Sequence, residues 1–306
     1  MFRKGLRHIF YKGEWVVGIR KVNDKPLFEI NGLDTRPNFI TMPRSLRYWQ
    51  ADPFIINIKD KIYIFFELWD NIKRKGELAY RVYVNGRFSK IHKIYESEYH
   101  LSYPFVSMDG TKVRIVPECY QSNELFSLLF NPQEGICEKE KVLVQQLSCV
   151  DSTFFKYKGQ SYFFTTPDIN GDRRSSLCLY TFLAGSWVKK AECIVNDNSR
   201  ARMAGAVIEK DDCLIRVSQN CKEMYGGSIV FSRIGDLTDD VYKENRICEI
   251  STNDVSFDRV SDIKGIHTYN CNGEYEVIDG YRYQFLNIYH IIGYLRKHLL
   301  KLLSLR

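Results

Sequence analysis

Several familiar signatures of metal and cofactor sites are missing from this chain of 306 residues. Its nine cysteines are scattered without a CxxC pair, which argues against a zinc ribbon or a thioredoxin-like redox centre. The sequence has no HExxH zinc motif and no calcium loop rich in Asp and Asn, and the Gly-Gly pair at 226–227 is not a phosphate-binding loop. We therefore expect that the protein requires no metal ion or other cofactor.

The amino terminus also lacks the apolar stretch of a signal peptide. Residues 1–15 read MFRKGLRHIFYKGEW and mix basic, aromatic and apolar side chains. The cysteines are odd in number, and most lie beside apolar residues in strand-like runs, as free thiols in a reducing compartment do. Together these features predict a cytoplasmic protein.

What the chain does contain is typical of a globular protein. Hydrophobic residues make up 44% of it and charged residues 26%, in a length that suits one large domain or two ordinary ones. The aromatic content of 14% favours β-structure or a sugar-binding surface. The formal net charge of +7 indicates an anionic partner. Basic residues are dispersed along most of the chain, so we do not expect that partner to be a nucleic acid.

A repeat of about fifty residues organises the chain. Each copy has a short apolar run, a turn such as Lys-Asp, Asp-Gly or Asn-Gly, and a second alternating run, a pattern that predicts a β-hairpin. The five copies are ADPFIINIKDKIYIFFE from residue 51, SYPFVSMDGTKVRIVPE from 102, VDSTFFKYKGQSYFFTT from 150, MAGAVIEKDDCLIRVSQ from 203 and GIHTYNCNGEYEVIDGY from 265.

Further strand-like pieces lie between these hairpins, for example at 78–90 and 176–190. Two hairpins per repeat make the four strands of a propeller blade. The repeat fills residues 45–280, and no long helical periodicity occurs before the carboxyl terminus. We therefore predict an all-β fold, a five-bladed β-propeller that forms a catalytic domain over residues 1–280. The alternative is a β-sandwich whose hairpins resemble one another by chance.

A propeller would bring five distant residues together. The innermost strand of each blade begins near the central channel, so the residues that open the five repeats should converge on one pocket. These residues are Asp52, Tyr103, Asp151, Ala204 and His267. Asp-Pro and Asp-Ser also initiate turns, but the equivalent positions of Asp52 and Asp151 favour a shared functional role.

The motifs of the repeats resemble a known family. ADPF, HLSYPFV followed by VPE, VDSTFF, RMAGAVI with LIRVSQNC and YGGSIVF, and GIHTYN are similar to the N-terminal propeller domain of plant glucosamine inositolphosphorylceramide transferases. Similar stand-alone proteins occur in bacterial surface-polysaccharide gene clusters. More distantly, the blade pattern is similar to glycoside hydrolase family 43 and to mannoside phosphorylases and mannosyltransferases of this architecture. The resemblance covers about residues 45–280 and implies a carbohydrate-active enzyme.

The resemblance to family 43 implies three carboxylates, and this sequence matches two of them. Those inverting hydrolases carry a base at the start of the first blade, a modulating Asp at the third and a Glu acid at the fourth. Asp52 matches the base and Asp151 the modulator, but RMAGAV places Ala204 where the acid would be. Glu118, at the end of VRIVPE in the second blade, is the alternative acid.

A missing acid together with arginines favours a transferase over a hydrolase. A hydrolase protonates a poor leaving group, and such acid catalysis contributes roughly 10²–10⁴-fold. A nucleotide departs as a stable anion and needs positive charge instead. Arg202 would supply it, with Arg200 and Arg216 nearby, because the guanidinium fork matches phosphate oxygens. The alternative for these arginines is pairing with acidic side chains.

Further residues are predicted to bind substrate in the same pocket. His100 and Tyr103 would donate hydrogen bonds to a sugar or stack on it. The alternatives are structural, since strand-end acids more often pair with basic groups and a lone histidine is more often a satisfied internal residue. With Arg202, the predicted substrate-binding set comprises His100, Tyr103, Glu67, Gln219, Tyr225 and His267.

The character of the sequence changes at residue 281. In YRYQFLNIYHIIGYLRKHLLKLLSLR apolar residues recur at spacings of three and four, five residues are Lys or Arg, and Asp and Glu are absent. The basic residues interrupt the apolar run, so the segment does not resemble a membrane span. We predict that 281–306 forms a basic amphipathic helix on an anionic membrane surface. The alternative is a helix that closes the propeller or packs on a partner.

These observations predict an inverting glycosyltransferase at the inner face of the cytoplasmic membrane. Its donor would be a nucleotide sugar and its acceptor a lipid-linked or growing surface glycan. Asp52 would be the base, Asp151 would orient the sugar or tune the base, and Arg202 would stabilise the departing phosphate. Two alternatives stay open: a family 43-type hydrolase with Glu118 as the acid, and a non-catalytic glycan-binding propeller that positions a separate transferase.

Overall fold

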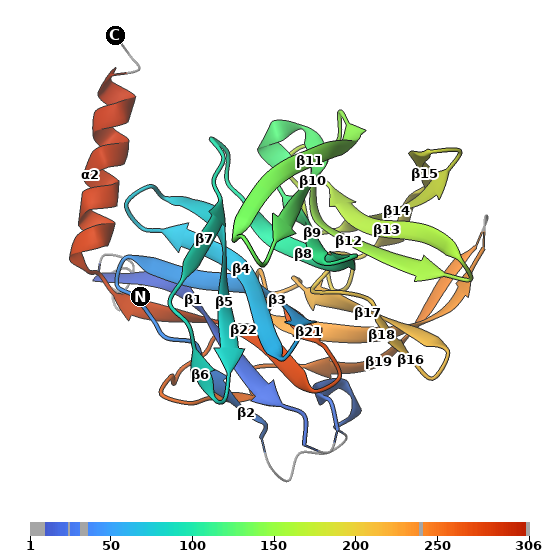
Figure 1. Ribbon diagram of the computed structural model, residues 1–306, viewed down its shortest axis with the longest axis horizontal. Helices are drawn as coiled ribbons and strands as arrows, with labels where there is room; N and C mark the ends of the chain where they lie inside the picture. Colours follow the sequence, from blue (N-terminus) through green and yellow to red (C-terminus); the bar gives the residue numbers. More distant parts are fainter. Residues whose placement is uncertain (1–9, 24, 31–35, 239–240, 304–306) are drawn as a thin grey trace.

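A computed structural model describes residues 10–23, 25–30, 36–238 and 241–303, and these form a five-bladed β-propeller followed by one helix (Figure 1). The predicted fold class is therefore confirmed.

The first two blades follow the chain outward from the axis through antiparallel neighbours. The first blade comprises β3 (Tyr48–Ile58), β4 (Lys61–Asp70), β5 (Lys75–Val84) and β6 (Arg87–Phe88), with β7 (His92–Tyr95) also paired to β5. The second comprises β8 (Ser102–Asp109), β9 (Lys112–Glu118), β10 (Glu124–Asn131) and β11 (Ile136–Gln145), with a short 3₁₀ helix, η2 (Tyr120–Ser122), between β9 and β10.

The next two blades repeat this order. The third comprises β12 (Cys149–Tyr157), β13 (Gln160–Pro167), β14 (Ser176–Leu183) and β15 (Ser186–Asn196). The fourth comprises β16 (Ile208–Lys210), β17 (Cys213–Asn220), β18 (Ser228–Leu237) and β19 (Tyr242–Ile250).

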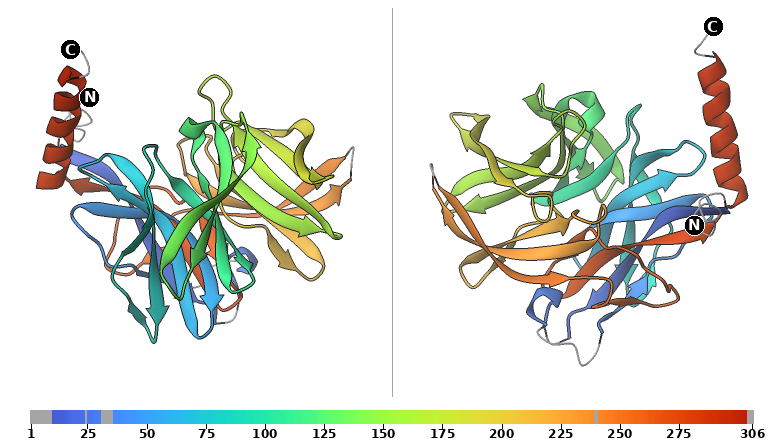
Figure 2. Two further views of the ribbon diagram at one scale, coloured as in Figure 1. Left: turned by 45° about the horizontal axis from the view of Figure 1, so that its top comes forward. Right: turned by 180° about the vertical axis from the view of Figure 1, so that it is seen from behind.

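Both ends of the chain build the fifth blade. Its strand order is β20 (Ser256–Phe257), β2 (Asn38–Thr41), β1 (Tyr11–Lys21), β22 (Tyr275–Phe285) and β21 (Tyr269–Cys271), and the 3₁₀ helix η1 (Leu27–Glu29) lies between β1 and β2. β1 pairs with β22 without a break from Tyr11–Phe285 to Lys21–Tyr275, and Figure 2 shows the two strands side by side. This ladder closes the ring of blades.

The long ladder also moves a predicted boundary. Residues 281–285, expected to belong to the helix, continue β22 because β1 offers them backbone partners. The helix α2 is Ile288–Leu303 and stands out from the body of the propeller in both views of Figure 2.

Aromatic side chains fill the spaces between blades, which accounts for their abundance. Phe54 and Phe105 join the first two blades with ring centroids 5.9 Å apart, and Phe105 and Phe154 join the next two at 5.6 Å. Phe164 and Tyr242 connect the third and fourth blades at 5.7 Å. Offset and edge-on contacts of this kind stabilise the interface between sheets.

Candidate functional site

A repeated backbone distortion opens the first three blades. Asp52, Tyr103 and Asp151 have φ angles of 50°, 40° and 53°, in the left-handed region that side chains other than glycine rarely adopt. At each of them the ladder between the first and second strands skips residues, as in a β-bulge. Such strain costs about 1–3 kcal/mol per residue and gathers at functional sites. The predicted equivalence of these three positions therefore extends to their backbone conformation.

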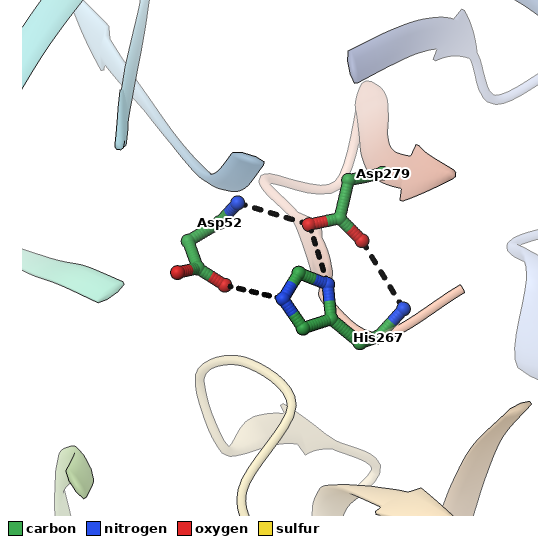
Figure 3. A group of neighbouring side chains, drawn as sticks. All are labelled: Asp52, His267 and Asp279. Carbon is green, nitrogen blue, oxygen red and sulfur yellow. Dashed lines mark hydrogen bonds and ion pairs between the residues drawn. The ribbon is translucent and has the colours of Figure 1, made fainter. Parts of the chain in front are cut away.

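Asp52 belongs to a chain of three charged side chains (Figure 3). The Nε2 of His267 lies 3.2 Å from Oδ1 of Asp52, and its Nδ1 lies 2.7 Å from Oδ2 of Asp279 on β22. The hydroxyl of Thr268 donates to Oδ1 of Asp52 at 2.8 Å, and the amide of Tyr103 donates to Oδ2 at 3.1 Å. The carboxylate of Asp52 is thereby held in one orientation.

The imidazole of His267 lies between two carboxylates, which favour its charged form. Burial lowers its pKa, but the charges of Asp279 and Asp52 outweigh burial and raise the pKa above its ordinary value. Burial also raises the pKa of Asp52, and the nearby His267 opposes that rise. The indole of Trp15, on β1, stacks on the imidazole with ring centroids 3.8 Å apart.

The same three side chains form a candidate cation site. Ligand atoms of Asp52, His267 and Asp279 lie within 4.8 Å of one another, and no other such group of three or more occurs within the described ranges of the chain. Each ring nitrogen of His267 already faces a carboxylate, so a metal ion would have to replace one of these contacts. The expectation that no metal is required stays a prediction.

A second cluster surrounds Arg202. Its Nε lies 2.5 Å from Oδ2 of Asp151, and its Nη2 lies 3.4 Å from Oε2 of Glu118. The side-chain amide of Gln219 donates to Oδ2 of Asp151 at 3.2 Å. The ring of Tyr225 lies 5.0 Å from the guanidinium, within cation–π range. Burial raises the pKa of Asp151, the positive charge of Arg202 opposes that rise, and the charge of Glu118 adds to it.

This cluster corrects the prediction that Arg202 is available to a departing phosphate. The guanidinium is buried and already engages two carboxylates, and its Nη1 donates to the backbone carbonyl of Arg173 at 3.0 Å. Arg216 is fully buried in an ion pair with Glu244. Arg200 also pairs with acids. All three arginines follow the alternative of pairing with acidic side chains.

Glu67 is a buried carboxyl with few neighbouring groups that offset the cost of its burial. No hydrogen-bond donor reaches its Oε1 in the part of the chain that the structure describes, and the Nε2 of His100 lies 3.7 Å away. Burial, with added repulsion from Asp52 and Glu118, raises the pKa of Glu67 well above its usual range. Burial also lowers the pKa of His100 to about 4. Burial therefore favours the neutral form of both side chains.

Gly76 allows this pair to approach the strand. Its amide donates to Nδ1 of His100 at 2.9 Å. A Cβ at this position would lie 2.7 Å from both Oε1 of Glu67 and Cε1 of His100, and 2.4 Å from the carbonyl oxygen of Leu101. Only glycine leaves the necessary space.

Besides Arg202 and Glu67, three residues of the predicted substrate-binding set are buried, which corrects their roles. Tyr103 is fully buried, and its hydroxyl bonds with Thr153 and the carbonyl of Gly205, so it connects blades and does not stack on a sugar. Gln219 is fully buried and supports Asp151, and His267 supports Asp52. His100 and Tyr225 are partly exposed and remain able to contact a substrate.

Asp279, Thr268 and Trp15 were not predicted from the sequence. One signal was present for Asp279. In three blades the second strand carries an acid opposite the start of the first strand. Glu67 faces Ala51 and Glu118 faces Ser102. In the fifth blade the amide of Asp279 donates to the carbonyl of Thr268. An acid inside an apolar strand was therefore the shared feature. Trp15 had no such signal because β1 lies outside the repeats.

The rim of the site carries two arginines that were also not predicted. Arg173 stacks on Tyr120 with its guanidinium carbon 4.1 Å from the ring centroid, and about a third of its side chain is exposed. Arg174 is exposed and lies 5.7 Å from the ring of Tyr225. Both belong to the segment between β13 and β14, next to Arg202.

Known proteins of similar structure share the fold. The α-L-arabinofuranosidase of Podospora anserina superposes with a TM-score of 0.54 at 10% identity, covering 76% of this chain and 90% of the other. A family 43 β-xylosidase/α-arabinofuranosidase from a compost microbial metagenome gives a TM-score of 0.53 at 10% identity, covering 88% and 95%. At this identity the likeness concerns the fold alone.

Plant proteins are similar to this chain in sequence as well. Glucosamine inositolphosphorylceramide transferase 1 of Arabidopsis thaliana is 27% identical over 207 residues, which is 63% of this chain and 26% of that protein. The protein of the same name from Oryza sativa subsp. japonica is 25% identical over 205 residues, 63% of this chain and 27% of its own length. The chain thus spans about a quarter of these relatives. Residues 42–276 match the family described as "Glucosamine inositolphosphorylceramide transferase 1, N-terminal", and the chain belongs to that family.

Proposed function

The clusters around Asp52 and Asp151 lie at the propeller axis, and we call them the axial site. We propose that this site transfers a sugar from a nucleotide-sugar donor to a lipid-linked or growing surface glycan, with inversion at the anomeric carbon. The observation that carries the proposal is the fixed carboxylate of Asp52, which His267, Thr268 and the amide of Tyr103 hold at the start of the first blade. The relatives' name, which describes a transferase, supports the same class of reaction.

Asp52 would act as the general base. A carboxylate offers about four acceptor positions, and three neighbours occupy three of them, so one remains for an acceptor hydroxyl. The hydroxyl would pass its proton to Asp52 while its oxygen bonds to the anomeric carbon. The bond from that carbon to the diphosphate would break, and the nucleoside diphosphate would leave with the electron pair.

The donor would extend from the axis to the rim. Asp151, fixed by Arg202 and Gln219, would orient the hydroxyls of the transferred sugar. Arg202 is occupied by two buried carboxylates, so we assign the diphosphate to Arg173 and Arg174, whose side chains reach solvent, although Nε of Arg173 also lies 3.6 Å from Oδ2 of Asp168. The partly exposed ring of Tyr225, between Arg202 and Arg174, would contact the sugar.

Glycoside hydrolysis is the second candidate, and Glu67 is the observation that favours it. A hydrolase needs a carboxyl with a raised pKa that can donate a proton, and burial raises the pKa of Glu67 well above its usual range. Glu118 was the acid expected from the sequence, but it faces Arg202. In this function Glu67 would protonate the leaving group and Asp52 would activate water.

The test combines binding and turnover. The protein would be screened by thermal shift and by product analysis against nucleotide sugars, nucleoside diphosphates and glycans. We expect one nucleotide sugar to raise the melting temperature. Asp52→Asn should keep that shift and lose roughly 10²–10⁴-fold in turnover, as removal of a general base does. Arg173→Ala should lose the shift, whereas the exposed Arg87→Ala on β6 should keep it.

Other outcomes would contradict the transferase. A response to glycans alone, with products that disappear in Glu67→Gln, would establish the hydrolase. Binding of glycans without turnover, unchanged in Asp52→Asn, would establish a non-catalytic module.

A further inference from the structure

The helix α2 contacts the propeller through its polar and small side chains. His290 and Gly293 are its buried residues. Gly293 sits so close to the turn between β4 and β5 that a Cβ there would lie 2.0 Å from the carbonyl oxygen of Asn71. Just before the helix, the side-chain amide of Asn287 donates to the carbonyl of Leu46 at 3.0 Å. The start of the helix is thus fixed to the first blade.

The apolar side of α2 faces away from this contact. Leu300 lines the cavity beside Gly293, but at about 3.6 residues per turn the other seven large aliphatic side chains fall on the side opposite His290 and Gly293. All of them are between 40% and 64% exposed: Ile288, Ile291, Ile292, Leu295, Leu299, Leu302 and Leu303. A helix that closes the propeller would bury these side chains, so the structure contradicts that alternative. We call these seven residues the apolar face of α2.

A cationic cavity lies beside the helix. It has a volume of about 240 Å³, between α2 and the turn that carries Gly293. Lys73 and Arg74 line it from the turn, and Arg296 and Lys297 from the helix, with no acidic side chain in its lining. Lys73 is paired with Glu77 and Glu96. The remaining cations give the cavity its positive charge.

We propose that α2 docks the protein on an anionic bilayer, with its apolar face among the acyl chains and the adjacent cavity around a lipid headgroup phosphate. Arg296 lies at the boundary between the apolar face and the cavity, where a phosphate at the level of the headgroups would meet it. The helix contains no acidic residue, which complements an anionic surface. No described helix has the length and hydrophobicity to cross a bilayer.

The position of α2 connects the bilayer to the axial site. The turn beneath Gly293 leads directly into β5, and Gly76 on that strand holds His100 at the rim. Docking through α2 would therefore bring the first blade's side of the site near the membrane. The proposal itself rests on α2 and the cavity, and it does not depend on which reaction the axial site performs.

The experiment is co-sedimentation of the full chain with vesicles of phosphatidylcholine alone or mixed with phosphatidylglycerol. We expect binding to the mixed vesicles only, weakened at high salt because the attraction is screened. Leu295→Asp with Leu299→Asp should reduce binding at least about tenfold, since both positions lose apolar contact with the acyl chains. Arg296→Glu with Lys297→Glu should remove the preference for anionic vesicles. Leu183→Asp, an exposed site on β14, is the matched control and should bind normally.

Two further measurements separate the alternatives. Inorganic phosphate added at the concentration of lipid phosphate should not release the protein, because the apolar contact requires the bilayer. Light scattering reports whether a second copy covers the apolar face. Dimerisation through this face, or equal binding by both double variants and the wild type, would overturn the proposal. Turnover at the axial site is measured separately without vesicles, so failure of docking is not confused with failure of the proposed function.

Discussion

Two groups of carboxylates face the propeller axis, and each is arranged around one cation. On one side His267 lies between Asp52 and Asp279, and on the other Arg202 lies between Asp151 and Glu118. All of these side chains are nearly buried. The charge of an arginine is permanent, whereas that of a histidine depends on pH. The two halves of one site should therefore respond differently to substitution and to pH.

This difference indicates that the two clusters have different roles in the site. The Arg202 cluster is a rigid support because its cation keeps its charge and binds through several nitrogens. The His267 cluster adjoins the proposed base and changes its charge within an accessible pH range. Substitution of members of the two clusters, and of the neighbouring Glu67, tests this difference.

The largest effect is expected from Arg202→Met. It would leave Asp151 and Glu118 buried without their cation, which typically costs about 3–5 kcal/mol in the free energy of unfolding. Urea unfolding measures this loss. Arg200→Met is the matched control, because Arg200 is more exposed, and we expect it to cost less than about 1 kcal/mol. Equal losses in the two variants would show that Arg202 does not carry the cluster.

A smaller and pH-dependent effect is expected from His267→Gln. The pKa of His267 is raised in the folded protein, so the stability due to its charge is complete below its ordinary pKa of 6.5. That stability is lost as the pH rises through the folded value. We expect a cost of about 1.5–3 kcal/mol at pH 6, typical of hydrogen bonds to charged groups, and a smaller cost at pH 9. Melting temperatures at both pH values check the sign, and a cost that grows with pH would contradict it.

The smallest effect, and one of opposite sign, is expected from Glu67→Gln. The pKa of Glu67 is raised in the folded protein, so the stability from its bound proton is complete below its ordinary pKa of 4.5 and is lost as the pH rises through the folded value. Gln has nearly the shape of the protonated Glu side chain and does not ionise, so the variant does not lose stability as the pH rises. The variant should therefore be more stable than the wild type at pH 8, by about 1 kcal/mol, and the gap should close towards pH 4.5.

Activity of the same variant separates the two candidate reactions. If the protein is a transferase, the rate of sugar transfer should change only a few-fold in Glu67→Gln. If it is a hydrolase, the rate of hydrolysis should fall by roughly 10²-fold or more because the general acid is lost. A variant that is less stable than the wild type at pH 8 would show that Glu67 is a charged partner of His100.

Much of this architecture follows from local patterns. The hairpin repeat predicted five blades because alternation and turn residues act over a few positions. The same alignment placed Asp52 and Asp151 at equivalent positions, and their left-handed backbone agrees with it. The segment after 281 was recognised as amphipathic from spacing alone, although its first residues proved to be strand.

Partners separated by most of the chain could not be predicted in this way. β1 pairs with β22 over about 260 residues of sequence, and the position of Trp15 on His267 depends on that pairing. The pairing of Arg202 could not be predicted because its anionic partners come from two other blades. Residue type limits what a side chain can bind, but its neighbours in space decide what it does bind.

Local sequence patterns were enough to predict the five blades, the positions of Asp52, Asp151 and His267 at the axis, and a helix with one apolar side. The folded arrangement was needed to show which cation pairs with each acid, which carboxyl has its pKa raised by burial, and which side of α2 faces outward. The reason is physical: strand and helix periodicity is a property of neighbouring residues, whereas burial, charge pairing and pKa depend on groups that folding brings together from distant parts of the chain.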